Sequence, residues 1–130
     1  MAEAVQGEKE KEFFYEYLIS VGPTESDRDL IISIRDDEKE HRDMFRTIYK
    51  DFTGQEIKEV LEEGAVKKQN SYLVGIQFGL FEALKEVEKY REIFKGLPEG
   101  YYRDAVSDMI SDKLKHATMY NFQYTKNLKS

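Results

Sequence analysis

The sequence carries an internal repeat, and this feature limits the possible folds more than any other. A shift of 75 residues aligns the two halves without a gap and places identical or similar residues on one another. A repeated half is one structural unit used twice, so the two halves are expected at about residues 7–54 and 71–127. The matched pairs are Tyr15/Tyr90, Pro23/Pro98, Arg28/Arg103, Asp29/Asp104, Asp37/Asp112, His41/His116, Met44/Met119, Phe45/Tyr120 and Tyr49/Tyr124.

Each half has the pattern of two helices separated by a short turn. Apolar residues recur every three or four positions, as in the buried stripe of a helix, and no strand pattern competes. A glycine and a proline near residues 22–23 and 96–98 separate the helices, and gaps of this length predict antiparallel hairpins. The expected helices cover about residues 7–21, 26–53, 71–96 and 101–127, with residues 1–6 frayed and residues 55–69 forming a crossover that contains a short helix. The sequence therefore predicts an all-α fold, a four-helix bundle of two hairpins, in a single domain of residues 1–130.

Two of the expected buried stripes contain ionisable residues. In the second helix the stripe runs through Glu38 and His41, and in the fourth it runs through Lys113 and His116. Burying such groups costs several kcal/mol unless they are paired or bind a metal. The expected inward residues are Phe14, Tyr17, Leu18 and Val21; then Ile31, Ile34, Glu38, His41, Phe45, Ile48 and Phe52; then Leu73, Ile76, Leu80, Ala83, Val87, Tyr90 and Phe94; and finally Val106, Met109, Lys113, His116, Tyr120 and Gln123.

Composition argues against several classes of function. The net charge is −6 and no basic patch stands out, which disfavours nucleic acid and anionic membranes as partners. The chain has no cysteine, so disulfides, iron–sulfur clusters and cysteine zinc sites are excluded. The N-terminal stretch is charged and lacks an apolar core, so we expect no signal peptide, and no apolar run approaches the roughly 20 residues that a membrane span needs. We expect a soluble, cytoplasmic protein.

The motifs of both halves resemble the ferritin-like di-iron carboxylate superfamily, nearest its small rubrerythrin-like members without the rubredoxin domain. The resemblance covers residues 7–127 and rests on the order of the hairpins and on the DExxH motif placed twice at matching depth. The segments that carry it are Gly7-Glu8 with Tyr15, Asp37-Glu38-Lys39-Glu40-His41, Ile48 to Gly54, Asp112 with His116-Ala117, and Tyr120-Asn121.

The resemblance implies metal ions in the bundle core, with iron or manganese as the cofactor. The first half would supply Glu8, with Glu12 as the alternative one turn along, together with Glu38 and His41. The second half departs from the family pattern, because Lys113 stands where the bridging glutamate belongs. Its remaining candidate ligands are Glu86 and His116.

Two interpretations of this departure stay open. In one, the site still binds one or two ions and acts on peroxide, dioxygen or ferrous iron, with electrons from an external donor. In the other, the ammonium of Lys113 replaces the metal charge and pairs with Glu38 and Glu8, which leaves a metal-free structural or partner-binding bundle. A homodimer is plausible in either case.

Overall fold

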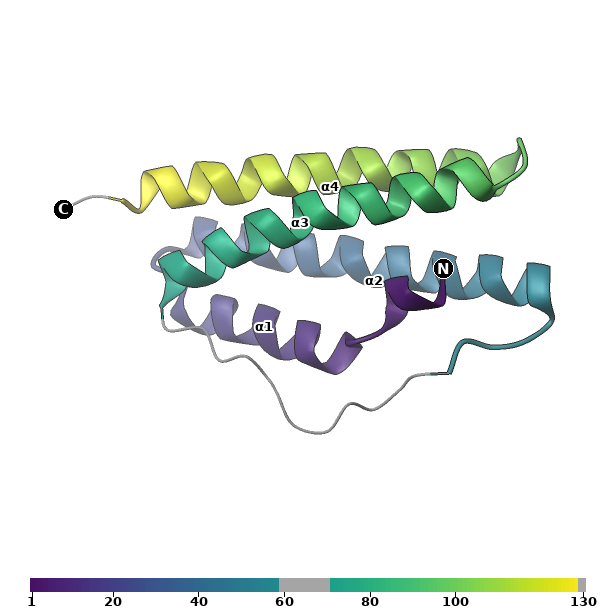
Figure 1. The fold of residues 1–130 in the computed structure, drawn as a ribbon. Coiled ribbons are helices and arrows are strands. Elements are labelled where there is room, and N and C mark those ends of the chain that lie inside the picture. The colour runs from purple at the N-terminus through teal and green to yellow at the C-terminus, as the bar shows by residue number, and fades with distance from the viewer. Residues whose placement is uncertain (59–70, 129–130) are drawn as a thin grey trace. The chain divides into compact units, whose positions relative to one another are not determined.

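The chain is all-helical in the computed structural model, which describes residues 1–58 and 71–128 (Figure 1). A short 3-10 helix, η1 (Ala2–Val5), is followed by the four α-helices α1 (Glu8–Val21), α2 (Glu25–Thr53), α3 (Tyr72–Gly96) and α4 (Tyr101–Lys126). The described residues contain no strand. The all-α prediction is confirmed, and the predicted short helix of the crossover falls mainly outside the described residues.

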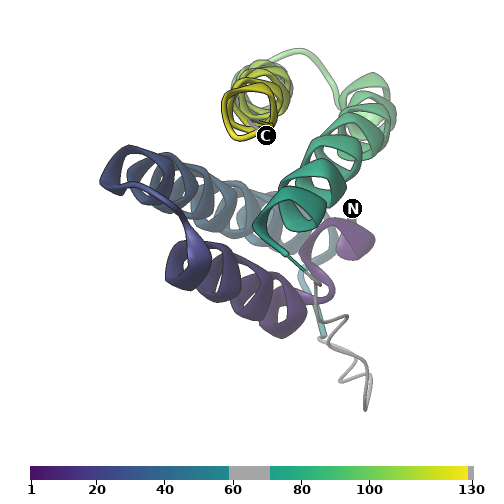
Figure 2. The ribbon, with the colours of Figure 1, turned by 90° about the vertical axis from the view of Figure 1, so that its left-hand side faces the viewer.

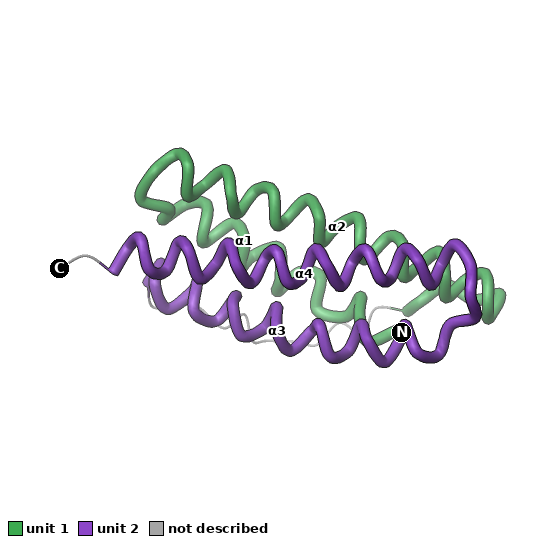
Figure 3. The backbone as a smooth tube through the Cα atoms, turned by 90° about the horizontal axis from the view of Figure 1, so that it is seen from above, with its two compact units in different colours: residues 1–68 green, residues 69–130 purple. Residues whose placement is uncertain are grey.

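The chain divides into two compact units, residues 1–68 and 69–130 (Figure 3). The boundary falls between the two predicted repeat halves. Each unit contains two α-helices that lie side by side, α1 with α2 and α3 with α4 (Figure 2). In the described part of the chain no helix is both long enough and apolar enough to cross a membrane.

The N-terminal residues of the first unit are ordered, so the prediction of a frayed segment is wrong. Val5 is fully buried, and the side-chain amide of Gln6 donates to the backbone oxygen of Lys58 at 3.0 Å. Gly7 then turns the chain into α1 with a left-handed φ of 72°, which glycine adopts without strain. A buried valine and a long-range hydrogen bond tie this segment down.

The ends of α2 follow from two residues of the sequence. The Thr24 hydroxyl oxygen accepts a hydrogen bond from the Asp27 backbone N–H at 3.1 Å and so caps the first turn. Gly54 ends the helix with a left-handed φ of 71°.

The buried stripe of α2 matches its prediction from Ile31 to Ile48, and Glu38 and His41 lie within it. Phe52 is instead 56% exposed. The two helices differ in length, since α1 has 14 residues and α2 has 29. The first residue of α1, Glu8, lies beside Arg42 and Arg46 of α2, so the last turns of α2 lie beyond the start of α1. The end of α2 therefore extends past α1. Val21, at the last turn of α1, is also exposed rather than inward.

The second unit pairs α3 with α4 in opposite directions, since low numbers in α3 meet high numbers in α4. Gln123 Nε2 donates to the Tyr72 hydroxyl at 3.2 Å near one end, and Lys113 meets Glu86 further along. The predicted stripe of α4 is buried at all six positions. Ser71 caps α3 by accepting from the Val74 backbone N–H at 3.1 Å.

In the N-terminal half of α3, the residues that are buried differ from those predicted, so the buried side of the helix is turned away from the predicted one. Tyr72, Gly75 and Gly79 are buried, whereas Leu73 and Leu80 are only partly covered. Gly79 allows the ring of Tyr120 to approach so closely that an added Cβ would lie 2.7 Å from Tyr120 Cζ. Gly79 favours this side because its missing side chain lets the Tyr120 ring of α4 approach closely.

Candidate functional site

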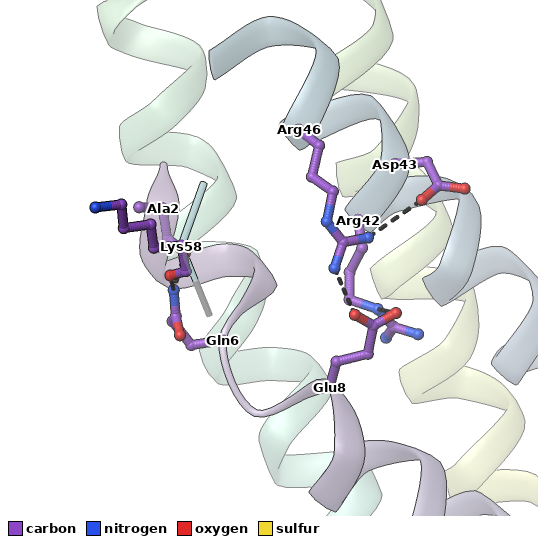
Figure 4. A network of polar contacts seen from close by, with 7 residues as sticks. All are labelled: Ala2, Gln6, Glu8, Arg42, Asp43, Arg46 and Lys58. Atoms are coloured by element: carbon purple, nitrogen blue, oxygen red, sulfur yellow. Dashed lines mark hydrogen bonds and ion pairs between the residues drawn. The ribbon is translucent and has the colours of Figure 1, made fainter. Parts of the chain in front are cut away.

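Glu8 is held by two arginines that lie one turn apart on α2 (Figure 4). Its Oε2 accepts a short hydrogen bond from Arg46 Nη2, and its Oε1 lies 3.4 Å from Arg42 Nε. Arg46 also donates to Asp43 Oδ1 at 3.2 Å. The first predicted metal ligand is thus engaged with two cationic side chains of its own unit.

The two arginines are in different environments. Arg46 is partly exposed, and burial alone would lower the pKa of its guanidinium. The hydrogen bond and charge of Glu8, helped by Asp43, outweigh that effect and raise the pKa of Arg46 above its ordinary value. Arg42 is only 1% exposed. Its contact with Glu8 is an ion pair without hydrogen-bond geometry, and its three guanidinium nitrogens have no hydrogen-bond partner among the described residues.

Glu38 and His41 come together on the buried face of α2, as their spacing predicts. His41 Nδ1 lies 3.9 Å from Glu38 Oε1, and both side chains are almost fully buried. One turn of helix separates the two residues, which places a carboxylate oxygen and an imidazole nitrogen side by side. These two groups have the donor chemistry that iron or manganese accepts.

In the second unit, Glu86 is paired with Lys113. Lys113 Nζ lies 2.7 Å from Glu86 Oε2, and both side chains are largely buried. The same ammonium lies 5.7 Å from the centroid of the Tyr90 ring, within the range of a cation–π interaction. The α3/α4 pair therefore contains its own buried carboxylate together with the cation that neutralises it.

His116 is fully buried in α4, one turn from Lys113. The structure thus places four of the five predicted metal ligands in the interior of two separate units: Glu38 and His41 in the first, Glu86 and His116 in the second. Across the described residues, no three His, Asp or Glu side chains are grouped so that they could hold one ion. The fifth ligand, Glu8, is partly exposed.

The donor set fits a dinuclear carboxylate centre poorly, because two of its carboxylates already have cationic partners. Metal binding by Glu8 would have to displace Arg46, and metal binding by Glu86 would have to displace Lys113. Pairing of Lys113 with Glu38 and Glu8 would join the two units, and it stays a prediction. The Lys113 ammonium is paired with Glu86 of its own unit. The sequence analysis considered Glu38 and Glu8 as its partners instead.

The sequence analysis missed Arg42 and Arg46 as the partners of Glu8. A signal for Arg42 exists, since it lies four residues after Glu38 and so continues the buried stripe as well as His41 does. Arg46 lies a further four residues along, on the side of α2 that faces the start of α1.

Comparisons of the chain with family models, with curated proteins and with solved structures give no match. The resemblance to the ferritin-like superfamily therefore rests on the motifs of the sequence alone.

Proposed function

We propose that this chain is a metal-independent helical protein with a structural or partner-binding role, in which basic side chains take the place of the metal ions. The observation that carries the proposal is the buried Lys113–Glu86 pair, whose N–O distance of 2.7 Å is that of a strong charge-assisted hydrogen bond. The arginines around Glu8 give the first unit the same arrangement. In both units a carboxylate of the first helix is neutralised from the second.

The proposed fold is a ferritin-like four-helix bundle built from the two units. The internal repeat, the four α-helices and the buried Glu-x-x-His of α2 support it. In this view the duplication preserved the helical framework, and the exchange of a glutamate for Lys113 removed the need for an ion. Excess carboxylates without a cation would repel one another and favour protonation.

Elemental analysis of the protein expressed with excess iron or manganese tests the proposal. We expect well under one ion per chain, because the carboxylates of Glu8 and Glu86 are engaged. The matched variant is Lys113→Glu combined with Ala83→Glu, which removes the ammonium and adds a carboxylate on α3. We expect the variant to take up metal and to be stabilised by Mn²⁺. Two ions per chain in the parent protein would overturn the proposal.

A second candidate function is the binding of a single metal ion, and the pair Glu38 and His41 favours it. Their buried oxygen and nitrogen atoms, 3.9 Å apart, would provide two ligands. This candidate predicts about one ion per chain in the parent protein, loss of that ion in His41→Leu, and retention in Glu86→Gln. The metal-independent proposal predicts no ion in any of the three proteins.

A further inference from the structure

Arg42 of α2 is a buried cation with hydrogen-bond donors to spare. Its side chain is 1% exposed, and none of its three guanidinium nitrogens has a hydrogen-bond partner among the described residues. Its contact with Glu8, at 3.4 Å, is an ion pair and not a hydrogen bond. A guanidinium has five N–H donors, and buried donors are nearly always satisfied by protein, water or a bound ion. The donors of Arg42 are therefore available to an additional acceptor.

Arg46 lies one turn after Arg42 and forms with it a pair of cations around a single carboxylate. Figure 4 shows both guanidinium groups beside the carboxylate of Glu8. Oε2 of Glu8 accepts a short hydrogen bond from Arg46 Nη2, and Oε1 is the oxygen next to Arg42. Two guanidinium groups that converge on one anion are typical of sites that bind carboxylate or phosphate groups.

We propose that Arg42 and Arg46 form a binding site for a phosphate group, and that Glu8 is an internal carboxylate that a phosphate displaces. Glu8 has two oxygens and one negative charge, and it hydrogen-bonds to only one of the two guanidinium groups. A phosphate group has at least three acceptor oxygens and up to about two negative charges at pH 7. It can therefore accept hydrogen bonds from both guanidinium groups at once, which a planar carboxylate in this position does not.

The exposures of the three side chains allow Glu8 to be exchanged for phosphate. The side chains of Arg46 and Glu8 are 36% and 24% exposed, whereas that of Arg42 is buried behind them. A phosphate that arrives from solvent can contact Arg46 first, and it reaches Arg42 when the Glu8 side chain rotates outward. Glu8 is the first residue of α1, so this rotation leaves the backbone of the helix in place.

Neighbouring carboxylates limit the affinity of the site. Asp43 accepts a hydrogen bond from Arg46 at 3.2 Å, but its side chain is 77% exposed and its charge is screened by water. Glu38 is buried one turn before Arg42, and the net charge of the chain is −6. Because Glu8 also competes for the same donors, we expect a dissociation constant of about 1 mM or higher for inorganic phosphate. The site requires no metal, and it does not rest on the function proposed above.

The first test is an NMR titration with inorganic phosphate, from about 0.1 to 50 mM, in metal-depleted Tris buffer at constant ionic strength. We expect Glu8→Gln, which removes the competing charge, to bind phosphate about tenfold more tightly than the parent protein, or better. The control Glu16→Gln makes the same charge change at an exposed position of α1 and should bind like the parent protein. No binding to Glu8→Gln, an affinity equal to that of the parent protein, or binding that requires added Mn²⁺ would overturn the proposal.

The second test removes the exposed cation of the site and does not depend on the folding of Glu8→Gln. We expect Arg46→Gln to weaken the binding of phosphate by the parent protein about tenfold or more. The control is Arg91→Gln, which removes an exposed arginine of α3 that is paired with Glu88, and it should bind phosphate like the parent protein. An affinity that is unchanged in Arg46→Gln would place the phosphate elsewhere and would overturn the proposal.

The third test identifies the chemical class of the ligand with sodium acetate and phenyl phosphate. Acetate carries the same planar, singly charged group as Glu8, so we expect it to bind Glu8→Gln about tenfold more weakly than phosphate does, or worse. Acetate that binds as tightly as phosphate would overturn the assignment to phosphate. Phenyl phosphate that binds as tightly as the free ion would assign the site to phosphate monoesters, and weaker binding would assign it to inorganic phosphate.

Discussion

Lys113 and Glu86 neutralise each other in the interior of the α3/α4 pair, and each residue depends on the other. Replacing Lys113 by methionine keeps most of the side-chain volume but leaves the Glu86 carboxylate without its cation. We expect Lys113→Met to lower the free energy of unfolding by about 3–5 kcal/mol, measured by urea denaturation.

The double variant Glu86→Leu with Lys113→Met is the control for this prediction. An apolar pair of similar volume replaces a buried ion pair at little cost, so most of the lost stability should return. If Lys113→Met alone unfolds at the same urea concentration as the parent protein, the ion pair does not hold the two helices together.

We expect Glu8 to stabilise the folded protein mainly through its contact with Arg42 and less through its contact with Arg46. Arg46 is solvated enough to tolerate the loss of its partner, whereas Arg42 would be left as a buried cation without a carboxylate beside it. We expect Glu8→Gln to cost about 2 kcal/mol of unfolding free energy. The matched control is Glu16→Gln, an exposed glutamate of the same helix, which should cost less than about 0.5 kcal/mol. Equal effects of the two variants would show that the arginine pair contributes nothing specific.

The stability that Arg46 contributes through its contact with Glu8 should not change with pH in the neutral to mildly alkaline range. Because the pKa of Arg46 is raised in the folded protein, the stability from its charge is fully present below its unfolded pKa and is lost only as the pH rises through the still higher folded value. No loss from this group is therefore expected between pH 6 and 9. Urea denaturation of the parent protein and Glu8→Gln at both pH values should give the same difference in stability.

At the scale of the helix, the fourth was the easiest to predict and the third the hardest. The stripe of α4 keeps steps of three and four residues from Val106 to Gln123, so the helical period identifies it as one face although Leu114 and Phe122 lie off it and are exposed. In α3 the residues from 72 to 81 carry no charge and only one polar side chain, Gln77, so periodicity cannot choose among their sides. Gly79 favours one side, because its missing side chain lets Tyr120 of α4 approach closely, and a hydropathy pattern does not register that.

Gly79 is expected to be the position of α3 least tolerant of an added methyl group. Its Cβ would lie within 2.8 Å of two ring atoms of Tyr120, which is itself buried. We expect Gly79→Ala to lower the unfolding free energy by about 1–3 kcal/mol, because overpacking outweighs the gain in helix propensity. The control Gly96→Ala meets no atom within 4 Å and should be neutral or stabilising by up to about 1 kcal/mol. A stabilised Gly79→Ala protein would contradict the close packing of α3 on α4.

For the molecule as a whole, the sequence predicted the order and limits of the four α-helices from the spacing of apolar residues and from glycines and prolines, all of which are local signals. It also placed Glu38, His41, Lys113 and His116 in the interior. It did not identify which cation meets which carboxylate, because that depends on the packing of neighbouring helices. Arg42 and Arg46 were missed for this reason, and the interpretation that gave Lys113 a pairing role named Glu38 and Glu8 rather than Glu86 as its partners.

The central claim is that side-chain cations, rather than metal ions, neutralise Glu8 in the first unit and Glu86 in the second. The most direct test is thermal unfolding of the parent protein, followed by circular dichroism, in excess chelator and in excess Mn²⁺ or Fe²⁺. A metal present at 100 times its dissociation constant adds about 2.7 kcal/mol to the folded state, which would raise Tm by about 8 °C or more in a chain of this size. We predict the same Tm within about 1 °C in both conditions. A rise of several degrees with metal, reversed by chelator, would contradict the account.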